Sequence, residues 1–415
     1  MASPLRRALA QPRFRRLFWS QTISRWGDTF SAVALVVLVF RLTGSGLSVA
    51  ITVALEVVPV LLFGLVAGAV VDRFPRVRVM VVADVGRAAI ALALAVFGDE
   101  LAVVYAAAFG LSTLTTFFNP AASSVVPALV DRDDVVGANS ALWSAAVVSQ
   151  IALAPLAGGL VAVAGAGPAF ALNAASFAVS ALLLRGLSVA VSMAPIPGGA
   201  EGPAGRLAAV RAGLAAVRRS RLLNTLAGVQ ALAALSAGAT SALLVVLAER
   251  HLDVGPGRFG LLLGAIGIGA GLGPLVLQRF VTDVRRPSLL FGPYLLRGAV
   301  DIVLAAFSSF GLALGALAVY GVGTSTGHVT YQTVLQTTVP ERLRGRVFAL
   351  YDMVWQSARL VSIGAGGVAA EAFGIRAVYL LGGALLIAAG LIGLVAVPAA
   401  RLGGDDHSAS YVETP

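Results

Sequence analysis

The sequence predicts an all-α polytopic membrane protein, with twelve transmembrane helices arranged as two pseudo-symmetric six-helix bundles. Three observations predict this class. Of the 415 residues, 58% are hydrophobic and only 12% are charged, about half the charged fraction of a soluble domain. Twelve apolar runs approach the ~20 residues that a membrane-spanning helix needs. The two halves of the chain also carry matching landmarks at corresponding places.

Composition excludes several classes of protein. A chain this apolar cannot bury its surface in one water-soluble core. We therefore exclude a soluble enzyme and a nucleic-acid-binding domain, despite the net charge of +10. The chain has no cysteine and only three scattered histidines, so we expect neither a metal cluster nor another cofactor. All 30 basic residues are arginine, and without a P-loop lysine we expect no ATP-driven pump.

The expected spans are the hydrophobic runs between glycine, proline and charged breaks. In chain order they are 17–40, 47–71, 80–98, 101–127, 139–164, 168–186, 222–247, 258–278, 288–307, 309–335, 347–370 and 375–397. Several connections are only a few residues long, so consecutive helices must run antiparallel.

The placement of arginine predicts the orientation in the membrane. These spans put 22 of the 30 arginines on the side that holds both termini and four on the opposite side. Because cytoplasmic loops are enriched in basic residues, we expect both termini in the cytoplasm. The exclusive use of arginine and the absence of an Asn-x-Ser/Thr sequon favour a bacterial source, and therefore the cytoplasmic (inner) membrane.

The connection 187–221 divides the chain into two halves of six spans. It opens with a proline- and glycine-rich run and continues with an amphipathic segment, whose apolar face carries Leu207, Val210, Leu214 and Val217. This pattern predicts a helix that lies on the cytoplasmic lipid surface. We expect bundles at 1–186 and 222–400, the linker at 187–221 and a cytoplasmic tail at 401–415.

Matching landmarks indicate that the two halves are duplicates. Each half has an arginine-bearing loop between its second and third spans, at 72–78 and 279–286. Each third span carries a charged pair, Asp84 with Arg87 and Arg297 with Asp301. Repeated halves of this kind are typical of secondary transporters.

Three motifs resemble those of the major facilitator superfamily. The run 68–78 (GAVVDRFPRVR) resembles the signature of the loop between helices 2 and 3. The run 339–348 (VPERLRGRVF) resembles an element before helix 11 in bacterial exporters similar to macrolide-efflux and enterobactin-export proteins. The run 154–159 (APLAGG) resembles the Gly-Pro-x-x-Gly-Gly pattern of antiporters. The resemblance extends over nearly the whole chain.

The resemblance implies a conformational latch on the cytoplasmic side. In the loop signature, Gly68 lets two helices pack closely, and the latch itself is made by charged residues: Asp72, Arg73, Arg76 and Arg78. We interpret Asp84 and Arg87 as a structural part of this latch, with Arg297 and Asp301 as their counterpart in the second half.

Two positions depart from the family pattern. The first glycine of the antiporter motif is Ala154 here, which bears on helix packing. The run 119–122 (NPAA) stands where relatives often have Pro-Ala-Arg. An arginine at the end of helix 4 is therefore missing, together with the contact that it would make with loop acids such as Asp131.

Two carboxylates lie near the middle of the membrane and are candidate proton carriers. Asp28 lies about 17 Å into its span and Glu56 about 15 Å, close to the midplane of a ~30 Å hydrocarbon core. An ionisable residue there costs about 2.5–3.5 kcal/mol, and desolvation favours its protonated form. We expect Asp28 to be the lead carrier. The alternative is an ion pair of Asp28 with Arg25, three residues away on the same helix face.

The resemblance implies that spans 1, 4, 7 and 10 line a central substrate cavity. Polar side chains on these spans are cavity candidates: Asn119, Gln230, His328, Tyr331 and Gln332. Arg25, Trp26, Phe30 and Arg359 are further candidates for contact with a charged or lipophilic ligand. Ordinary roles are the alternatives: a hydrogen-bonded His328, an Arg359 paired with Asp352, and aromatic residues, Phe117 and Phe118 among them, that pack between helices.

A glycine run in the eighth span superficially suggests a nucleotide-binding loop. Its members are Gly264, Gly267, Gly269, Gly271 and Gly273. The run does not follow a strand and lies inside an apolar span, so it predicts close helix packing through small residues.

Taken with the resemblance, these observations predict a monomeric secondary transporter in the lipid bilayer. We expect it to export lipophilic or amphipathic small molecules in exchange for protons by alternating access. One alternative is a gradient-driven importer of a sugar or metabolite, which a richer set of polar cavity residues would favour. Another class of alternative is a lipid flippase or a non-transporting sensor.

Overall fold

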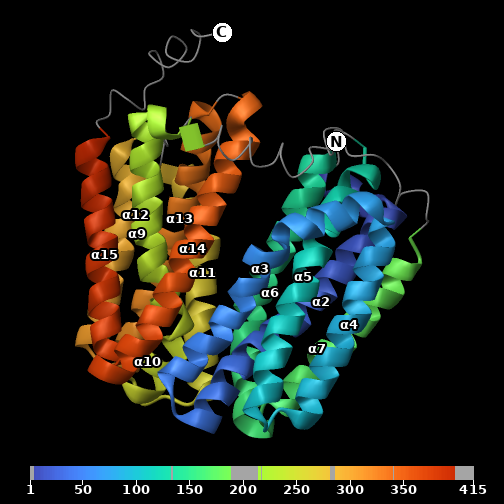
Figure 1. The fold of residues 1–415 in the computed structure, drawn as a ribbon, viewed down its shortest axis with the longest axis horizontal. Coiled ribbons are helices and arrows are strands. Elements are labelled where there is room, and N and C mark those ends of the chain that lie inside the picture. The colour runs from blue at the N-terminus through green and yellow to red at the C-terminus, as the bar shows by residue number, and fades with distance from the viewer. Residues whose placement is uncertain are drawn as a thin grey trace. The chain divides into compact units, whose positions relative to one another are not determined.

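The computed structural model describes residues 4–131, 134–187, 214–215, 217–280, 286–339 and 341–397. These residues form helices joined by short turns, with no strand among them. The all-α fold predicted from the composition is therefore confirmed (Figure 1). The tail at 401–415 and most of the predicted interfacial helix at 206–218 lie outside the described residues.

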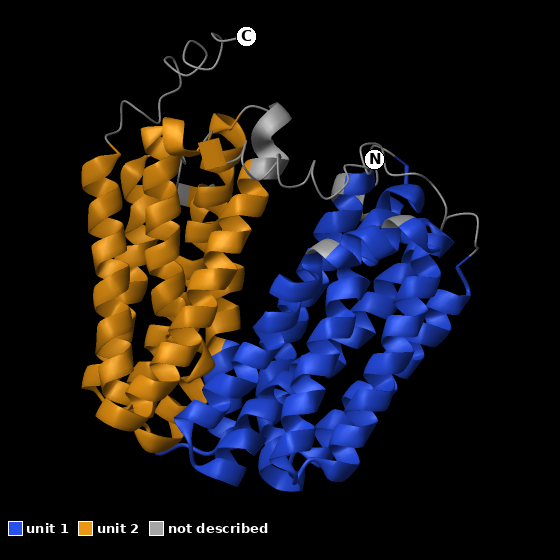
Figure 2. Cartoon of the chain, in the orientation of Figure 1, with its two compact units in different colours: residues 1–200, 253–264 blue, residues 201–252, 265–415 orange. Residues whose placement is uncertain are grey.

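Two compact units divide the chain: residues 1–200 with 253–264, and residues 201–252 with 265–415 (Figure 2). Unit 1 contains α1 (Pro4–Ala10), α2 (Pro12–Thr43), α3 (Gly46–Arg73), α4 (Arg76–Phe97), α5 (Leu101–Val125), the 3-10 turn η1 (Val126–Ala128), α6 (Val135–Ala164) and α7 (Gly167–Arg185). Unit 2 contains α9 (Arg221–Ala242), α10 (Leu244–Arg250), most of α11 (Pro256–Phe280), α12 (Pro287–Ala306), α13 (Phe310–Thr338), α14 (Glu341–Phe373) and α15 (Ile375–Ala396). The bundle boundaries at 1–186 and 222–400 stay a prediction.

Local sequence signals determine where the first helices end. α2 stops at Gly44, which adopts a φ of 61°, a left-handed conformation that glycine takes without strain. Ser45 then caps α3, because its hydroxyl oxygen accepts a 3.2 Å hydrogen bond from the Ser48 N–H. Pro75 separates α3 from α4, since proline lacks an N–H and disfavours helical geometry in the residue before it.

Eleven helices of the described residues are long and apolar enough to cross a membrane. The twelfth expected span, 347–370, lies within α14, which carries Asp352, Arg359 and Glu371 and is therefore less apolar. Several predicted boundaries were wrong, and α14 begins at Glu341, ahead of the predicted start at 347. α2 begins at Pro12, ahead of the predicted start at 17. The span 222–247 is broken at Leu243, where α9 ends and the short helix α10 follows.

The two halves of the chain repeat the same helix pairings. α4 packs against α5 and α7, and correspondingly α12 packs against α13 and α15. α2 packs against α6 and α7, and correspondingly α9 packs against α14 and α15. Equivalent spans thus meet equivalent neighbours within each half, as expected of a duplicated six-helix unit.

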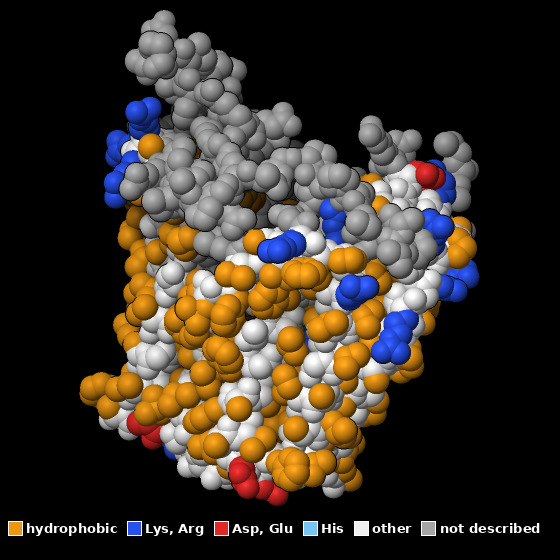
Figure 3. Space-filling view, turned by 45° about the vertical axis from the view of Figure 1, so that its right-hand side comes forward, with side chains coloured by type: hydrophobic (Ala, Val, Ile, Leu, Met, Phe, Trp, Pro, Cys, Tyr) orange, Lys and Arg blue, Asp and Glu red, His pale blue; other side chains and the backbone are white. Residues whose placement is uncertain are grey.

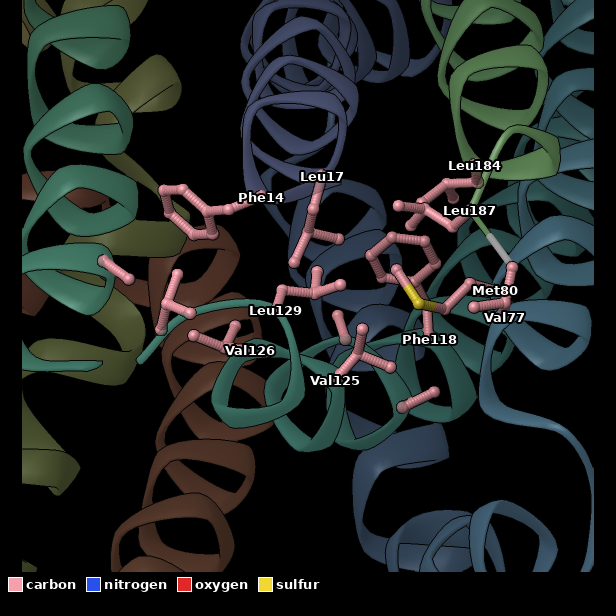
Figure 4. Packing of buried hydrophobic residues seen from close by; sticks show 14 of the residues in the cluster. Phe14, Leu17, Val77, Met80, Phe118, Val125, Val126, Leu129, Leu184 and Leu187 are labelled. Atoms are coloured by element: carbon pink, nitrogen blue, oxygen red, sulfur yellow. The ribbon is translucent and has the colours of Figure 1, made fainter. Parts of the chain in front are cut away.

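A cluster of buried side chains holds together one end of unit 1. Phe14, Leu17, Met80, Phe118 and Leu184 come together from α2, α4, α5 and α7 (Figure 4). Val71, just before the predicted latch loop at 72–78, and Val77, near its end, belong to the same cluster. The two ends of that loop are therefore fixed to the core of the unit.

The surface is apolar, as a lipid-facing protein requires. Large apolar side chains are exposed, among them Val163 at 91% and Val395 at 85%. Hydrophobic side chains cover most of the face seen in Figure 3, and arginines gather toward one end of it. Soluble monomers rarely expose apolar surface on this scale.

Candidate transport site

Unit 2 contains a cavity lined by five of the predicted cavity residues. Its volume is about 790 Å³, within the range of small-molecule sites. The five residues come from α9, α13 and α14: Gln230, His328, Tyr331, Gln332 and Arg359.

Sequence reasoning missed the aromatic and charged remainder of the lining: Tyr294, Arg297, Tyr320, Phe348, Tyr351, Asp352 and Trp355. Several of them lie on α12 and α14, outside the spans that the resemblance singles out. A signal was present in α14, because Phe348, Asp352, Trp355 and Arg359 are separated by four, three and four residues. This spacing puts four lining side chains on one helix face.

Hydrogen bonds and ring contacts position the tyrosines of the cavity. The Tyr294 hydroxyl donates to Gln230 Oε1 at 3.4 Å. The Tyr351 hydroxyl donates to the Leu223 carbonyl at 2.5 Å, and the Tyr351 ring lies edge-on to Tyr331 with 6.0 Å between centroids. The Tyr331 hydroxyl has no hydrogen-bond partner within the described part of the chain. Fixed aromatic rings therefore line the cavity beside a buried hydroxyl that lacks a partner among the described residues.

Arg297 and Asp301 do not form the pair that their spacing predicts. The Arg297 guanidinium donates to the Tyr320 hydroxyl at 2.9 Å and lies 4.7 Å from the centre of that ring. Asp301 is 1% exposed, and its Oδ2 has no hydrogen-bond partner among the described residues. Tyr320, in place of Asp301, is therefore the partner of Arg297. The prediction that Arg297 and Asp301 form a pair like that of Asp84 and Arg87 was wrong.

Asp84 and Arg87 form a buried ion pair within α4, three residues apart. Ser180 on α7 donates a 2.6 Å hydrogen bond to the second carboxylate oxygen of Asp84. The Arg87 guanidinium lies over two aromatic rings, 4.3 Å and 4.4 Å from the centroids of Phe118 and Phe177. The partners of Asp84 thus lie inside unit 1 and do not include the arginines of the 72–78 loop.

The two candidate proton carriers both have exposed side chains. The charges of Arg87, Arg25 and Asp84 act on the Asp28 carboxylate. No ion pair between Asp28 and Arg25 occurs among the described residues, so the alternative of an intrahelical pair is not formed. At Glu56 the backbone carbonyl accepts a hydrogen bond from Ser112 on α5.

Four further cavity candidates belong to unit 1 and do not line the cavity of unit 2: Arg25, Trp26, Phe30 and Asn119. Trp26 is 40% exposed and donates from its indole N–H to Ser149 Oγ at 2.9 Å. Arg25 and Asn119 are exposed and Phe30 is half-buried. Phe118 is only 5% exposed and belongs to the core cluster. Ordinary helix packing is therefore the role of Phe118.

The latch residues are only partly described. Arg73 and Arg78 are exposed, whereas Arg76 is 6% exposed and donates to the Ser124 carbonyl at 3.4 Å. The side chain of Asp72 lies outside the described part of the structure. A Cβ on Gly68 would meet no atom within 4 Å, so the close helix packing that the resemblance implies is not seen at this glycine.

The loop before α6 obtains a basic partner from the N-terminal segment. Arg7 on α1 forms an ion pair with Asp134 at 2.9 Å, and Gln11 donates to Asp131 Oδ2 at 3.5 Å. Residues before α2 therefore contact both acidic residues of this loop.

Glycines produce close helix crossings at two places. The antiporter-like motif on α6 approaches residues 256–260, because a Cβ on Gly158 would lie 2.8 Å from the Gly260 Cα. Further along α11, a Cβ on Gly269 or Gly273 would collide with α13. The prediction that this glycine run serves helix packing is confirmed.

The repeated helices, the apolar surface and the polar-aromatic cavity define a polytopic membrane transporter. The chain belongs to the transmembrane secretion effector family (MFS_3), whose model matches residues 2–412. The predicted resemblance to the major facilitator superfamily is confirmed.

Relatives in bacteria cover nearly the whole chain. The uncharacterized MFS-type transporter YfiS of Bacillus subtilis is 29% identical over 93% of this chain and 95% of its own length. The multidrug efflux pump Tap of Mycobacterium tuberculosis is 28% identical, with 94% of each chain covered. The enterobactin exporter EntS of Escherichia coli is 27% identical, with 94% and 93% covered.

Solved structures support the fold alone. A bacterial homologue of the iron transporter ferroportin in the inward-facing state has a TM-score of 0.73 at 17% identity, covering 92% of this chain and 98% of its own. The nucleoside transporter NupG has a TM-score of 0.76 at 13% identity, covering 93% and 100%.

Proposed function

We propose that the protein exports lipophilic or amphipathic small molecules in exchange for protons, by alternating access. The cavity of unit 2 is the observation that carries this proposal. Its lining combines aromatic rings with amide, hydroxyl and charged groups, which suits a ligand with an apolar body and a polar group. The names of two relatives, a multidrug efflux pump and an enterobactin exporter, support export over import.

Asp28 and Glu56 are the proton carriers of this proposal, with Asp28 in the lead. Its position in the middle of α2 supports this role, and the charges of Arg87, Arg25 and Asp84 act on its carboxylate. The energy is sufficient: one charge that crosses 100 mV yields about 2.3 kcal/mol. At 1.4 kcal/mol per factor of ten, this supports a substrate gradient of roughly 50-fold.

The test uses the full chain in proteoliposomes with an imposed pH gradient. A growth-inhibition panel in an efflux-deficient bacterium first identifies exported compounds among amphiphilic antibiotics and dyes. Asp28→Asn is expected to abolish gradient-driven transport of these compounds, whereas Asp99→Asn, in the exposed turn between α4 and α5, should retain it. If Asp28→Asn transports at the normal rate, Asp28 is not the carrier.

The loop 72–78 is the proposed latch of the transport cycle. Both ends of the loop are fixed to the core of unit 1, so its charged side chains are held on a rigid base. Asp72→Asn is expected to slow turnover while substrate binding stays measurable. Unchanged turnover in that variant would exclude the latch.

The proposal also includes location and assembly. The excess of arginine on one side of the spans supports a bacterial inner membrane with both termini in the cytoplasm. We propose that one chain is the transporting unit.

A further inference from the structure

Asp301 is a buried acidic group to which the transport cycle above assigns no role. It is 1% exposed, and within the described residues it forms no ion pair and its Oδ2 accepts no hydrogen bond. The corresponding carboxylate of the first half, Asp84, has both an arginine and a serine partner. A charged carboxylate in an apolar environment is costly without such partners. The neutral, protonated form of Asp301 therefore fits its site better.

The helices that pack around Asp301 bring few titratable groups toward it. Arg297 lies one turn earlier on α12, and its guanidinium donates to the Tyr320 hydroxyl of α13. Tyr379 of α15 donates its own hydroxyl to the Thr240 carbonyl at 2.6 Å. Among the described residues, the titratable groups that act on Asp301 are Arg297, Tyr320 and Tyr379. Neither the Arg297 guanidinium nor the Tyr379 hydroxyl is hydrogen-bonded to its carboxylate.

A second unpartnered oxygen lies beside Asp301. The Ser236 hydroxyl of α9 is buried and has no hydrogen-bond partner in the described part of the chain. A Cβ on Gly382 would lie 3.3 Å from Ser236 Oγ and 3.8 Å from Asp301 Oδ2. Two unsatisfied polar atoms thus border the same glycine, in a protein whose buried polar groups are normally paired.

Arg297 connects Asp301 to the cavity. Arg297 and Tyr320 line the cavity, whereas Asp301 does not. A charged Asp301 offsets the positive charge of Arg297 one helical turn away. A protonated Asp301 leaves that charge uncompensated where a ligand would bind, in a region of low dielectric constant where charges act strongly.

We propose that Asp301 is a second proton-binding site, and that its protonation changes the electrostatic potential in the cavity by leaving the charge of Arg297 uncompensated. Protonation makes the potential in the cavity more positive, so it weakens the binding of cationic ligands and strengthens the binding of anionic ones. A proton and a cationic ligand then compete, and linkage makes this competition reciprocal. The inference deepens the proposed proton coupling, but binding alone tests it.

The test compares two ions of the same shape and opposite charge, tetraphenylphosphonium and tetraphenylborate, neither of which titrates. Their affinities for the purified full chain are measured by calorimetry from acidic to basic pH, with empty detergent micelles as the blank. We expect tetraphenylphosphonium to bind about tenfold more tightly at basic pH, and tetraphenylborate about tenfold more weakly. Parallel changes for both ions would overturn the proposal.

Variants assign the effect to one residue. Asp301→Asn carries no charge, so both affinities should stay near their acidic-pH values throughout, whereas Asp99→Asn, in the exposed turn between α4 and α5, should retain both pH dependences. Retention in Asp301→Asn, or loss in Asp99→Asn, would show that Asp301 is not the group. If the protein shows no gradient-driven export but its ligand binding changes with pH as described, the proposed function is contradicted and the role of Asp301 is not.

A spectroscopic measurement covers the case in which Asp301→Asn does not fold. Infrared difference spectra of the unmodified protein should show the carbonyl band of a protonated carboxyl group that disappears toward basic pH. This band should shift in Asp301→Glu. A spectrum without a band that responds to Asp301→Glu would contradict the proposal.

Discussion

Ser180 on α7 donates a 2.6 Å hydrogen bond to the carboxylate of Asp84 on α4. Asp84 also pairs with Arg87, and the two side chains of the pair are 0% and 3% exposed. The desolvation of two charges is costly, and the pair offsets that cost only while both members are present. Asp84 and Arg87 therefore stabilise the contact between α4 and α7 only as an intact pair.

Removal of Arg87 should consequently destabilise the fold far more than removal of an exposed arginine. Arg87→Ala leaves Asp84 as a buried charge without its cation, and we expect a loss of about 3–5 kcal/mol in the free energy of unfolding. Arg13→Ala, at an exposed position of α2, should stay within about 0.5 kcal/mol. Denaturant unfolding in detergent micelles measures both.

A double variant separates the charge effect from the loss of packing. Asp84→Asn combined with Arg87→Ala removes the orphaned charge, so it should recover part of the stability that Arg87→Ala loses. Equal stabilities of the single and double variants would mean that Arg87 contributes through its contacts with Phe118 and Phe177 alone.

Gly27 allows α2 to approach α7 next to the candidate proton carrier Asp28. A Cβ at this position would meet the Ser176 hydroxyl and lie 2.8 Å from the Asn173 Cα. Because a backbone atom cannot move aside cheaply, we expect Gly27→Ala to cost about 1–3 kcal/mol. Gly64→Ala on α3, where a Cβ meets nothing within 4 Å, is the matched control and should gain slightly from helix propensity. Equal unfolding midpoints of the two variants would contradict this account.

The sequence predicts the fold well and the site in part, for a physical reason. Hydrophobic runs report which segments enter lipid, so the spans and their repetition could be predicted. Polar residues inside those runs, such as Gln230 and Gln332, stand out for the same reason, and both line the cavity.

Other features depend on tertiary contacts that no local pattern encodes. The i, i+4 spacing of Arg297 and Asp301 favours an ion pair. The Arg297 guanidinium instead donates a hydrogen bond to the Tyr320 hydroxyl on the next helix. The Ser180 bond to Asp84 joins residues 96 positions apart. Aromatic cavity residues such as Tyr294 look like ordinary packing until the helices are assembled.

Trp355 should make a large contribution to the binding of an amphipathic ligand. It lies on the lining face of α14 between Asp352 and Arg359, and truncation of a central aromatic contact typically costs 2 kcal/mol or more. Trp355→Ala should therefore weaken the binding of an exported compound by about 30-fold. Trp143→Ala on α6, 57% exposed and outside this cavity, should bind normally. Equal affinities of the two variants in equilibrium binding would exclude Trp355 as a ligand contact.

The orientation in the membrane can be tested directly, because the chain contains no cysteine and any introduced thiol is the only one. Asp99→Cys lies in the turn between α4 and α5, and Arg13→Cys lies near the start of α2; both positions are exposed. If the side with most arginines faces the cytoplasm, a membrane-impermeant maleimide should label Asp99→Cys in intact cells and spare Arg13→Cys. Lysed cells should label both, which shows that each thiol is reactive. Labelling of Arg13→Cys alone in intact cells would show that the orientation is the opposite of the predicted one. The proposed direction of transport would then have to be reversed as well.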